Sequence, residues 1–515
     1  MNLNKLLTAL RQRKNTPAHT QQAERHERYT HALEQFLNGH QPAVRLGGAY
    51  TLANLADEWL TDASLPEQAR REEAQAIVDA LTECIRTPYP LAQSQQVLET
   101  DEAPEGYEGD FARDQEALRE EQLVRRTVFT EFSRRLAAVA ESTEKDNGEN
   151  QHAVPSVSPM WADLRFNFGG APIFYPLGQL HFQNADFASA TFYGPADFSG
   201  TTFHGDTSFS AAQFTTDASF HGANFTGGAD FSDAVFSAAV DFAVSTFKAD
   251  ADFSRLNTAG IASFATVTFD GNAVFTASTF HDEAHFAASV FNRPAVFSKS
   301  LFGGVARFAG VVTKQSAMFS GVRFASAADF SGAYFTQFAD FDGARFDGDA
   351  TFSRSSFFAV IRTSYDMDFP QYANFANAAF AQGADFSEAT FTAFVGFGRA
   401  TFAGTVSFNG VSFEGAYFAD AKFSQKADFR QTRFSYAEPS FWDSEGQQKS
   451  ARFSAHANPQ DYLFGTRSES PHGFSYGEAE LLNRTFVLPI GAVLYDPDSW
   501  NEEQQEYTRI SEPAQ

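Results

Sequence analysis

The segment from His281 to His285 comes nearest to metal chemistry in this sequence, because it holds His281, Asp282, Glu283 and His285. Zinc proteases of the His-Glu-x-x-His type place two His side chains four residues apart on a helix, with a Glu directly after the first His. Here an Asp follows the first His, and the segment lies inside a repeat without helical spacing. We therefore expect these side chains to face solvent at a corner of the fold, and we predict no metal site.

Other signals of catalysis are missing from the sequence. It contains no glycine-rich phosphate loop, no nucleophile elbow and no Cys cluster. His204 and His221 directly follow Phe residues at outward positions, so we interpret them as surface residues. The sequence therefore predicts no catalytic residues, no cofactor and no enzyme activity.

Phenylalanine sets the organisation of the chain. The protein has 59 Phe, and over residues 181–434 a Phe falls at nearly every fifth or sixth position. Two positions before almost every Phe stands a small residue, for example Ala229 or Ala251. This spacing fits neither a helix, with its 3.6 period, nor an alternating strand. It indicates a coil of short flat sides, in which the small residue and the Phe both point inward.

The repeat resembles the pentapeptide-repeat family, whose motif is A-[DN]-[LF]-[ST]-x. The resemblance implies a mainly β fold, a right-handed quadrilateral β-helix with four sides per coil. Here the steps alternate between five and six residues, so four sides need about 22 residues and a bulge at alternate corners. A flattened two-sided solenoid with eleven residues per coil is the alternative. The 22-residue coil predicts an interior Phe ladder through Phe187, Phe209, Phe231, Phe253, Phe275, Phe297, Phe319 and Phe341.

We divide the 515 residues into four parts. Residues 1–150 form an α-helical domain of HEAT-like hairpins, with helices over 3–10, 21–37, 44–60, 67–87 and 118–140 and an acidic loop over 91–115. Residues 151–181 are a linker and the N-terminal cap of the solenoid. Residues 182–434 form the β-helix, and 435–515 form a C-terminal cap with a frayed tail. The segments ERYTHALEQF and VRLGGAYTLANLADEW also look like the helical part of many actinobacterial pentapeptide-repeat proteins.

Irregular positions in the repeat carry further expectations. Thr258 and Thr313 stand where Phe is expected, and we predict soft spots there. The register slips between Phe357 and Phe375, which indicates a loop or bulge. Trp442 and Phe464 are candidate plugs for the C-terminal end of the solenoid.

Composition limits the classes of partner and the compartment. The net charge is −26 and the pI is about 4.8, which argues against direct nucleic-acid binding because phosphate contacts need Lys and Arg. The lone Cys84 fits a reducing compartment, and we interpret it as helix core. No leader is visible, and no apolar stretch approaches the roughly 20 residues of an integral membrane span. We expect a cytoplasmic protein, while the family resemblance leaves peripheral membrane association open.

Charged residues supply the candidate partner-binding surface. In the regular repeats, an Asp often directly precedes a Phe of the class that the longer step reaches. The candidate partner-binding residues among them are Asp186, Asp197, Asp230, Asp241, Asp252, Asp329 and Asp340, and the same position recurs at Asp385 and Asp428. In a four-sided coil they form acid columns on two opposite sides, with Asp230 and Asp252 one coil apart. Residues 293–323 hold no acid and five bases, which we call the basic belt: Arg293, Lys299, Arg307, Lys314 and Arg323.

These surfaces favour a non-catalytic scaffold that binds a protein partner, whose identity the sequence does not give. The alternative is an acidic mimic of DNA, because the family includes gyrase-protecting proteins whose acidic rods imitate the duplex. A mimic needs continuous acid along one face, and the basic belt interrupts it. Residues 182–292 of the repeats hold twelve acids and two bases. The basic belt and this acidic half could also attract one another between copies, which would give a homo-oligomer.

Overall fold

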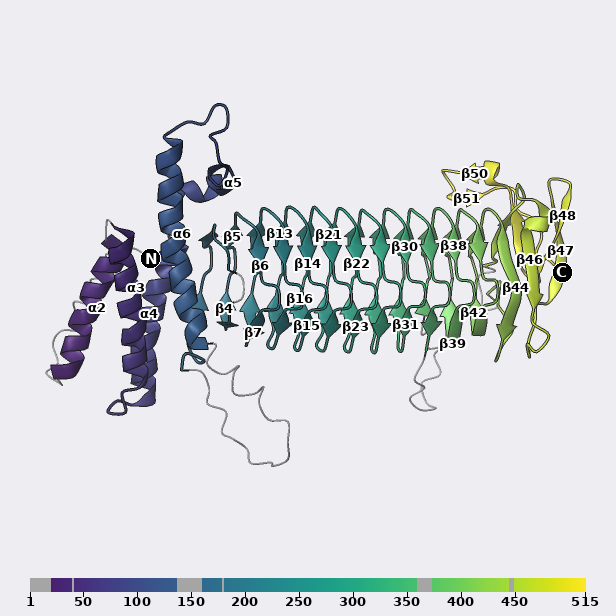
Figure 1. Cartoon of the computed structure of the whole chain (residues 1–515). Helices are drawn as coiled ribbons and strands as arrows, with labels where there is room; N and C mark the ends of the chain where they lie inside the picture. Colours follow the sequence, from purple (N-terminus) through teal and green to yellow (C-terminus); the bar gives the residue numbers. More distant parts are fainter. Residues whose placement is uncertain (1–19, 39–40, 137–159, 178–179, 359–372, 444–448) are drawn as a thin grey trace. The chain divides into compact units, whose positions relative to one another are not determined.

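The computed structural model describes residues 20–38, 41–136, 160–177, 180–358, 373–443 and 449–515. Its backbone contacts divide the chain into a helical unit, Met1–Phe168, and a β unit, Gly169–Gln515 (Figure 1). The helix predicted over 3–10 and residues 151–159 of the predicted linker lie outside the described residues. No helix in the described ranges has the length and apolar character needed to cross a bilayer.

The helical unit is built from successive packed helices. They are α2 (Thr20–Asn38), α3 (Pro42–Leu60), α4 (Glu67–Arg86), η1 (Pro90–Ser94), α5 (Gln95–Leu98) and α6 (Phe111–Leu136). Helix α3 packs on α2, α4 and α6. A Cβ on Gly48 would lie 2.6 Å from the backbone nitrogen of Phe36, so this glycine allows α2 and α3 to approach closely. Cys84 is buried in α4, as predicted.

The segment 91–115 is not the continuous loop that its polar composition predicted. It includes most of η1, all of α5 and the first residues of α6. Leu98 and Ala92 are buried, and the Gln115 amide donates to the carbonyl of Leu98 at 2.8 Å. These buried apolar residues and several side-chain hydrogen bonds, including a second one from Gln115 to the Thr100 carbonyl at 2.8 Å, hold part of this acidic segment against α6.

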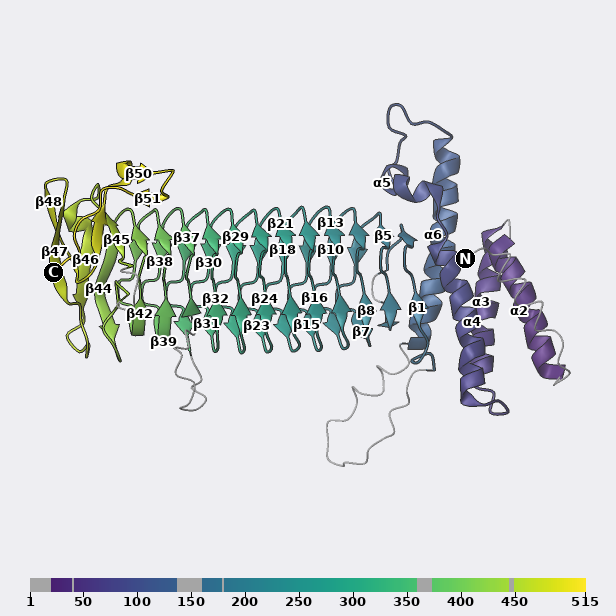
Figure 2. The same ribbon diagram turned by 180° about the vertical axis from the view of Figure 1, so that it is seen from behind.

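The β unit is a parallel solenoid with four short strands in each coil. One coil contains β12 (Ala229–Asp230), β13 (Val235–Phe236), β14 (Val240–Asp241) and β15 (Thr246–Phe247), which we take to define the first, second, third and fourth sides. The next coil begins with β16 (Ala251–Asp252), which pairs with β12 in the register Ala229↔Ala251. The same 22-residue advance relates the other sides. The fold repeats through about 12 turns, so the two-sided alternative is wrong (Figures 1 and 2).

Phenylalanine rings fill the interior of the coil. On the first side every predicted ladder member from Phe187 to Phe341 stacks on the next. Phe275 is typical, with ring centroids 4.8 Å from Phe253 and 4.8 Å from Phe297. Rings on the opposite first and third sides meet edge to face across the interior, as Phe264 and Phe275 do at 5.2 Å. Both arrangements are favourable for aromatic quadrupoles.

The corners alternate in length, as the five- and six-residue steps predicted. When each side is counted as the three residues that end in its inward Phe, a two-residue corner follows the first and third sides, and a three-residue corner follows the second and fourth. In the short corner after Phe242, the N–H of Ser245 donates to the Phe242 carbonyl at 3.1 Å. Val244 has φ +63° there, so the corner is a β-turn with a left-handed third residue.

The structure locates the irregular positions of the repeat, while the predicted soft spots at Thr258 and Thr313 stay a prediction. Thr258 and Thr313 occupy Phe positions and are buried, and their hydroxyls have no hydrogen-bond partner among the described residues. Between Phe341 and Phe375 the first-side ladder advances by 34 residues instead of 22, and the two rings still stack at 4.8 Å. The register slip is therefore confirmed, while residues 359–372 lie outside the described ranges.

The C-terminal part caps the solenoid. It contains β44 (Ala427–Phe434), β45 (Arg452–Ser454), η3 (Pro459–Asp461), β46 (Tyr462–Thr466), β47 (Tyr476–Leu481), β48 (Arg484–Pro489), β49 (Val493–Tyr495), η4 (Pro497–Ser499), β50 (Trp500–Asn501) and β51 (Glu506–Tyr507). Phe464 stacks on Phe429 at 5.4 Å, as expected of a plug. The Trp442 prediction is wrong by one residue. Phe441 stacks on Phe418 at 5.0 Å, and the alternation of the backbone turns Trp442 outward, 45 % exposed.

The last residues do not fray as predicted. Ala514 is buried and its N–H donates to the carbonyl of Ala492 at 2.8 Å. The N–H of Glu478 donates to the carbonyl of Gln515. Backbone pairing with the cap therefore holds the end of the chain, which its polar composition did not reveal.

Candidate functional site

Each Asp of the predicted acid columns is a turn residue. Asp252 is typical, because its Oδ1 accepts the backbone N–H of Ser254 at 2.8 Å. The same bond, to the N–H two residues further on, forms at Asp186, Asp197, Asp230, Asp241, Asp329, Asp340, Asp385 and Asp428. The acceptor satisfies the first N–H of the two-residue corner. This explains why the acids occur only before a short step.

The acid columns are interrupted on both sides. Asp230 and Asp252 are register neighbours on the first side, as predicted, but Val274, Val296 and Met318 continue that column before Asp340. On the third side the column alternates, in the order Asp197, Ser219, Asp241, Ser263, His285, Arg307, Asp329, Thr351, Asp385, Ser407 and Asp428. Neither side carries continuous negative charge.

The basic belt does not form one patch, because its residues lie on different sides and corners. Arg307 is on the third side in β26 (Ala306–Arg307), and Arg323 is on the second side in β29 (Arg323–Phe324). Lys299 lies in a short corner, whereas Arg293 and Lys314 lie in the long corners that follow the fourth side. Arg323 also pairs with Asp347 at 2.7 Å, so part of the belt is neutralised within the solenoid.

The segment that most resembled a metal motif contains an ion-pair cluster. Glu283 pairs with both Arg307 and His285 on the third side. Hydrogen bonds from Arg307 and then from His285 lower the pKa of Glu283 to about 2. His281 and Asp282 are exposed at the corner, as expected. The guanidinium of Arg307 therefore supplies the positive charge beside this His and Glu.

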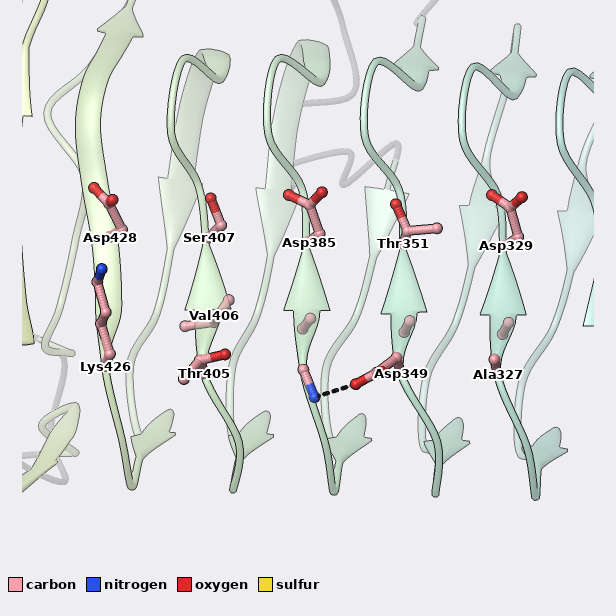
Figure 3. Close-up of a pocket in the computed structure, with 14 residues that line it drawn as sticks. Ala327, Asp329, Asp349, Thr351, Asp385, Thr405, Val406, Ser407, Lys426 and Asp428 are labelled. Atoms are coloured by element: carbon pink, nitrogen blue, oxygen red, sulfur yellow. Dashed lines mark hydrogen bonds between the residues drawn. The ribbon is translucent and has the colours of Figure 1, made fainter.

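A shallow groove of about 620 Å³ follows the third side over the coils after the basic belt. One rim carries the outward side chains of the third-side column (Figure 3): Asp329, Thr351, Asp385, Ser407 and Asp428. The other rim lies at the long corner and carries Ala327, Asp349, Gly383, Thr405 and Lys426. Small inward residues such as Ala350 and Ala384 form the floor between the rims.

The groove carboxylates differ in their partners. Asp349 Oδ1 accepts the backbone N–H of Gly383 at 2.9 Å. At Asp428 burial raises the pKa, but the hydrogen bonds from the Arg430 side chain and N–H outweigh it, so the pKa is lowered. Asp329 and Asp385 have no ion-pair partner in the part of the chain that the structure describes. Asp329 nevertheless lies in register with Arg307 and interacts electrostatically with its charge.

Sequence reasoning named Asp329 as a partner-binding candidate and placed Asp385 and Asp428 only in the acid columns, and it missed Asp349 and Lys426. Both missed residues stand three positions after the inward residue of the second side, at the end of a long corner. Asp206, Asp217 and Asp250 stand at the same place in other long corners, and each accepts an N–H from the coil that follows. That recurrence was the available signal. It predicts that a residue at this place accepts an N–H from the coil that follows. Only the folded structure shows that Asp349 and Lys426 line a groove.

The comparisons with known proteins agree with this geometry. A family model described as pentapeptide repeats matches residues 187–235 in nine copies. The searches of curated proteins and of solved structures found no match. The matched residues lie wholly within the 22-residue coils.

Proposed function

Because this chain belongs to the pentapeptide-repeat proteins, we propose that it is a non-catalytic scaffold whose third-side groove binds an extended, basic segment of a partner protein. The observation that carries the proposal is the spacing of Asp329, Asp385 and Asp428, which recur on every second coil of one groove rim. A cytoplasmic location fits the single buried Cys84.

The spacing selects a class of ligand backbone. Coils repeat at the interstrand distance, so carboxylates two coils apart are separated by roughly 9.6 Å. A polyproline-II segment rises about 3.1 Å per residue with three residues per turn, so its side chains on one face recur every ~9.3 Å. A segment with Lys or Arg at every third position therefore keeps register with this rim.

The charges along the groove also favour a basic ligand. Asp329 and Asp385 lack internal ion-pair partners among the described residues, whereas Asp428 is compensated by Arg430. A basic ligand would place further cations beside these two carboxylates. Exposed ion pairs contribute only about 1 kcal/mol or less each, so we expect weak binding that decreases as salt screens it.

The test uses a fluorescent peptide with the repeat Pro-Pro-Lys and a control peptide of the same composition with its Lys residues adjacent. Anisotropy titrations of the full chain should show tighter binding of the spaced peptide. The double variant Asp329→Asn with Asp385→Asn should weaken it by roughly tenfold, since Asn can still accept the turn hydrogen bond. The matched control is Asp241→Asn, on the same side outside the groove. Equal affinity for both peptides, or for both variants, would refute the proposal.

The second candidate, an acidic mimic that binds a nucleic-acid-binding protein such as DNA gyrase, draws its support from the overall charge of −26. Continuous acid along one side would favour it, and the columns are instead broken by Val296, Met318 and Arg307. A gyrase supercoiling assay with the full chain decides between the two. Self-association through the basic belt remains a prediction, and a mass that is independent of ionic strength in sedimentation would contradict it.

A further inference from the structure

A His and two Asp residues come together in the C-terminal cap, away from the groove. Strand β45 pairs with β49 in the register Ser454↔Tyr495, so the residues that follow both strands emerge side by side. His456 Nε2 lies 3.1 Å from Asp496 Oδ1 and 3.8 Å from Asp498 Oδ2. The three ligand atoms lie within 4.8 Å of one another.

The rest of the cap holds the central carboxylate in place. The Asp496 side chain is 2 % exposed, and its Oδ1 accepts the N–H of Asp498 at 3.0 Å. Its Oδ2 pairs with the Arg509 guanidinium at 2.6 Å, and its backbone N–H donates to the carbonyl of Arg509. Outer hydrogen bonds of this kind orient a ligating carboxylate and reduce the cost of burying it.

The other two ligands are open to solvent. The side chains of His456 and Asp498 are 45 % and 76 % exposed. An ion can therefore reach the cluster from water, and the Asp498 side chain can rotate toward it. One imidazole nitrogen with two carboxylate oxygens is a donor set that suits Zn²⁺ and chemically similar divalent ions.

We propose that His456, Asp496 and Asp498 bind one divalent transition-metal ion, with Zn²⁺ as the best match and water in the remaining positions. The ion replaces the hydrogen bond between His456 and Asp496 and draws in Asp498. It then links the segment after β45 to the segment after β49. Because the ion binds the folded cap and not the separated segments, it stabilises the C-terminal end of the solenoid.

The test starts from the full chain, stripped of metal with a chelator and titrated with Co²⁺ and with Zn²⁺ at neutral pH. One Co²⁺ per chain should bind with visible d–d absorption, and Zn²⁺ should displace it and raise the Tm. His456→Ala and Asp498→Asn should each weaken binding at least tenfold. Asp498 is exposed, so its variant keeps the fold even where the His456 variant does not.

The matched control is His221→Ala. His221 also lies 3.1 Å from a carboxylate oxygen, that of Asp241, but it has no third ligand in the described part of the chain. Binding should be unchanged in this variant. The proposal is overturned if the full chain binds no Co²⁺ under these conditions. It is equally overturned if Asp498→Asn binds the ion as tightly as the unaltered chain.

Discussion

Asp340 shows how one outward carboxylate serves the turn at a cost. Its Oδ1 accepts the N–H of Asp342 at 3.1 Å and the side-chain amide of Asn374 at 3.0 Å. The residue is only 8 % exposed, and this burial raises the pKa of Asp340 despite those two hydrogen bonds. Asn374 occupies the same position one coil later and makes the same turn bond without a charge.

We predict that Asp340→Asn stabilises the protein at pH 7, with a rise in Tm on the order of 1 °C. The folded-state pKa of Asp340 is raised, so the ionised carboxylate costs stability above that value. The cost disappears as the pH falls through the raised folded pKa and below the unfolded one. The gain from the Asn variant should therefore be present at neutral pH and shrink in acid. Thermal unfolding from pH 7 to pH 3.5 measures it.

The Ala variant at the same position separates the charge from the hydrogen bond. Asp340→Ala also removes the charge, but it leaves the Asp342 N–H without its acceptor. It should lower the stability by about 1 kcal/mol. A rise in Tm of Asp340→Asn that does not depend on pH would contradict the prediction. A rise in Tm of Asp340→Ala would contradict it as well.

At the scale of the element, the short corners repeat one backbone conformation with very different residues. Gly222, Val244 and Thr266 occupy the same corner in three successive coils and all have φ near +60°. Glycine adopts this conformation freely, whereas a β-branched residue pays a steric cost there. The coil as a whole imposes the conformation, because ladder hydrogen bonds fix the strands on both sides of the corner.

We predict that Val244→Gly stabilises the solenoid by about 1 kcal/mol, because the left-handed conformation is costly for valine. The reverse change is Gly332→Val at a corner of the same kind. A Cβ at Gly332 meets nothing within 4 Å, so Gly332→Val measures the cost of the left-handed backbone conformation without a steric clash. We expect it to destabilise the solenoid by a similar amount. Denaturant melts of both variants check this. If both variants changed the free energy of unfolding in the same direction, side-chain contacts and not the backbone angle φ would determine the effect.

The elements also show what the sequence could and could not predict. Phe spacing predicted the four sides, the 22-residue coil and the ladder of Phe275, because each side carries one inward ring. The acid columns were found, but their turn role was not, since the Asp252 bond depends on where the Ser254 N–H points. The groove was not predictable, because Asp349 and Asp385 belong to different coils and only the coiled backbone brings them to one surface. The Trp442 prediction was wrong because neighbouring side chains point in opposite directions and Phe441, the adjacent aromatic residue, takes the inward position.

At the scale of the whole β unit, stability is distributed coil by coil. Each ring contacts the rings directly above and below it, as Phe275 contacts Phe253 and Phe297. The backbone follows the same rule, with the Phe253 N–H donating to Val274 and the Phe275 N–H donating to Val296. A solenoid of this kind behaves as a sum of coils and nearest-neighbour interfaces. Damage to one coil should therefore remain local.

We predict that Phe275→Ala opens only the coils next to it. The lost ring should cost about 3–5 kcal/mol locally, so the amides of Phe253 and Phe275 should exchange with deuterium much faster. The amide of Phe341, three coils along the same ladder, donates to Asn374 at 2.7 Å and should keep its protection.

Val274→Ala, on the outward position of the same side, is the control and should change little. Faster exchange spread evenly from Phe187 to Phe434 would instead mean that the β unit unfolds as one cooperative block, because a nearest-neighbour solenoid cannot transmit the loss of one ring that far.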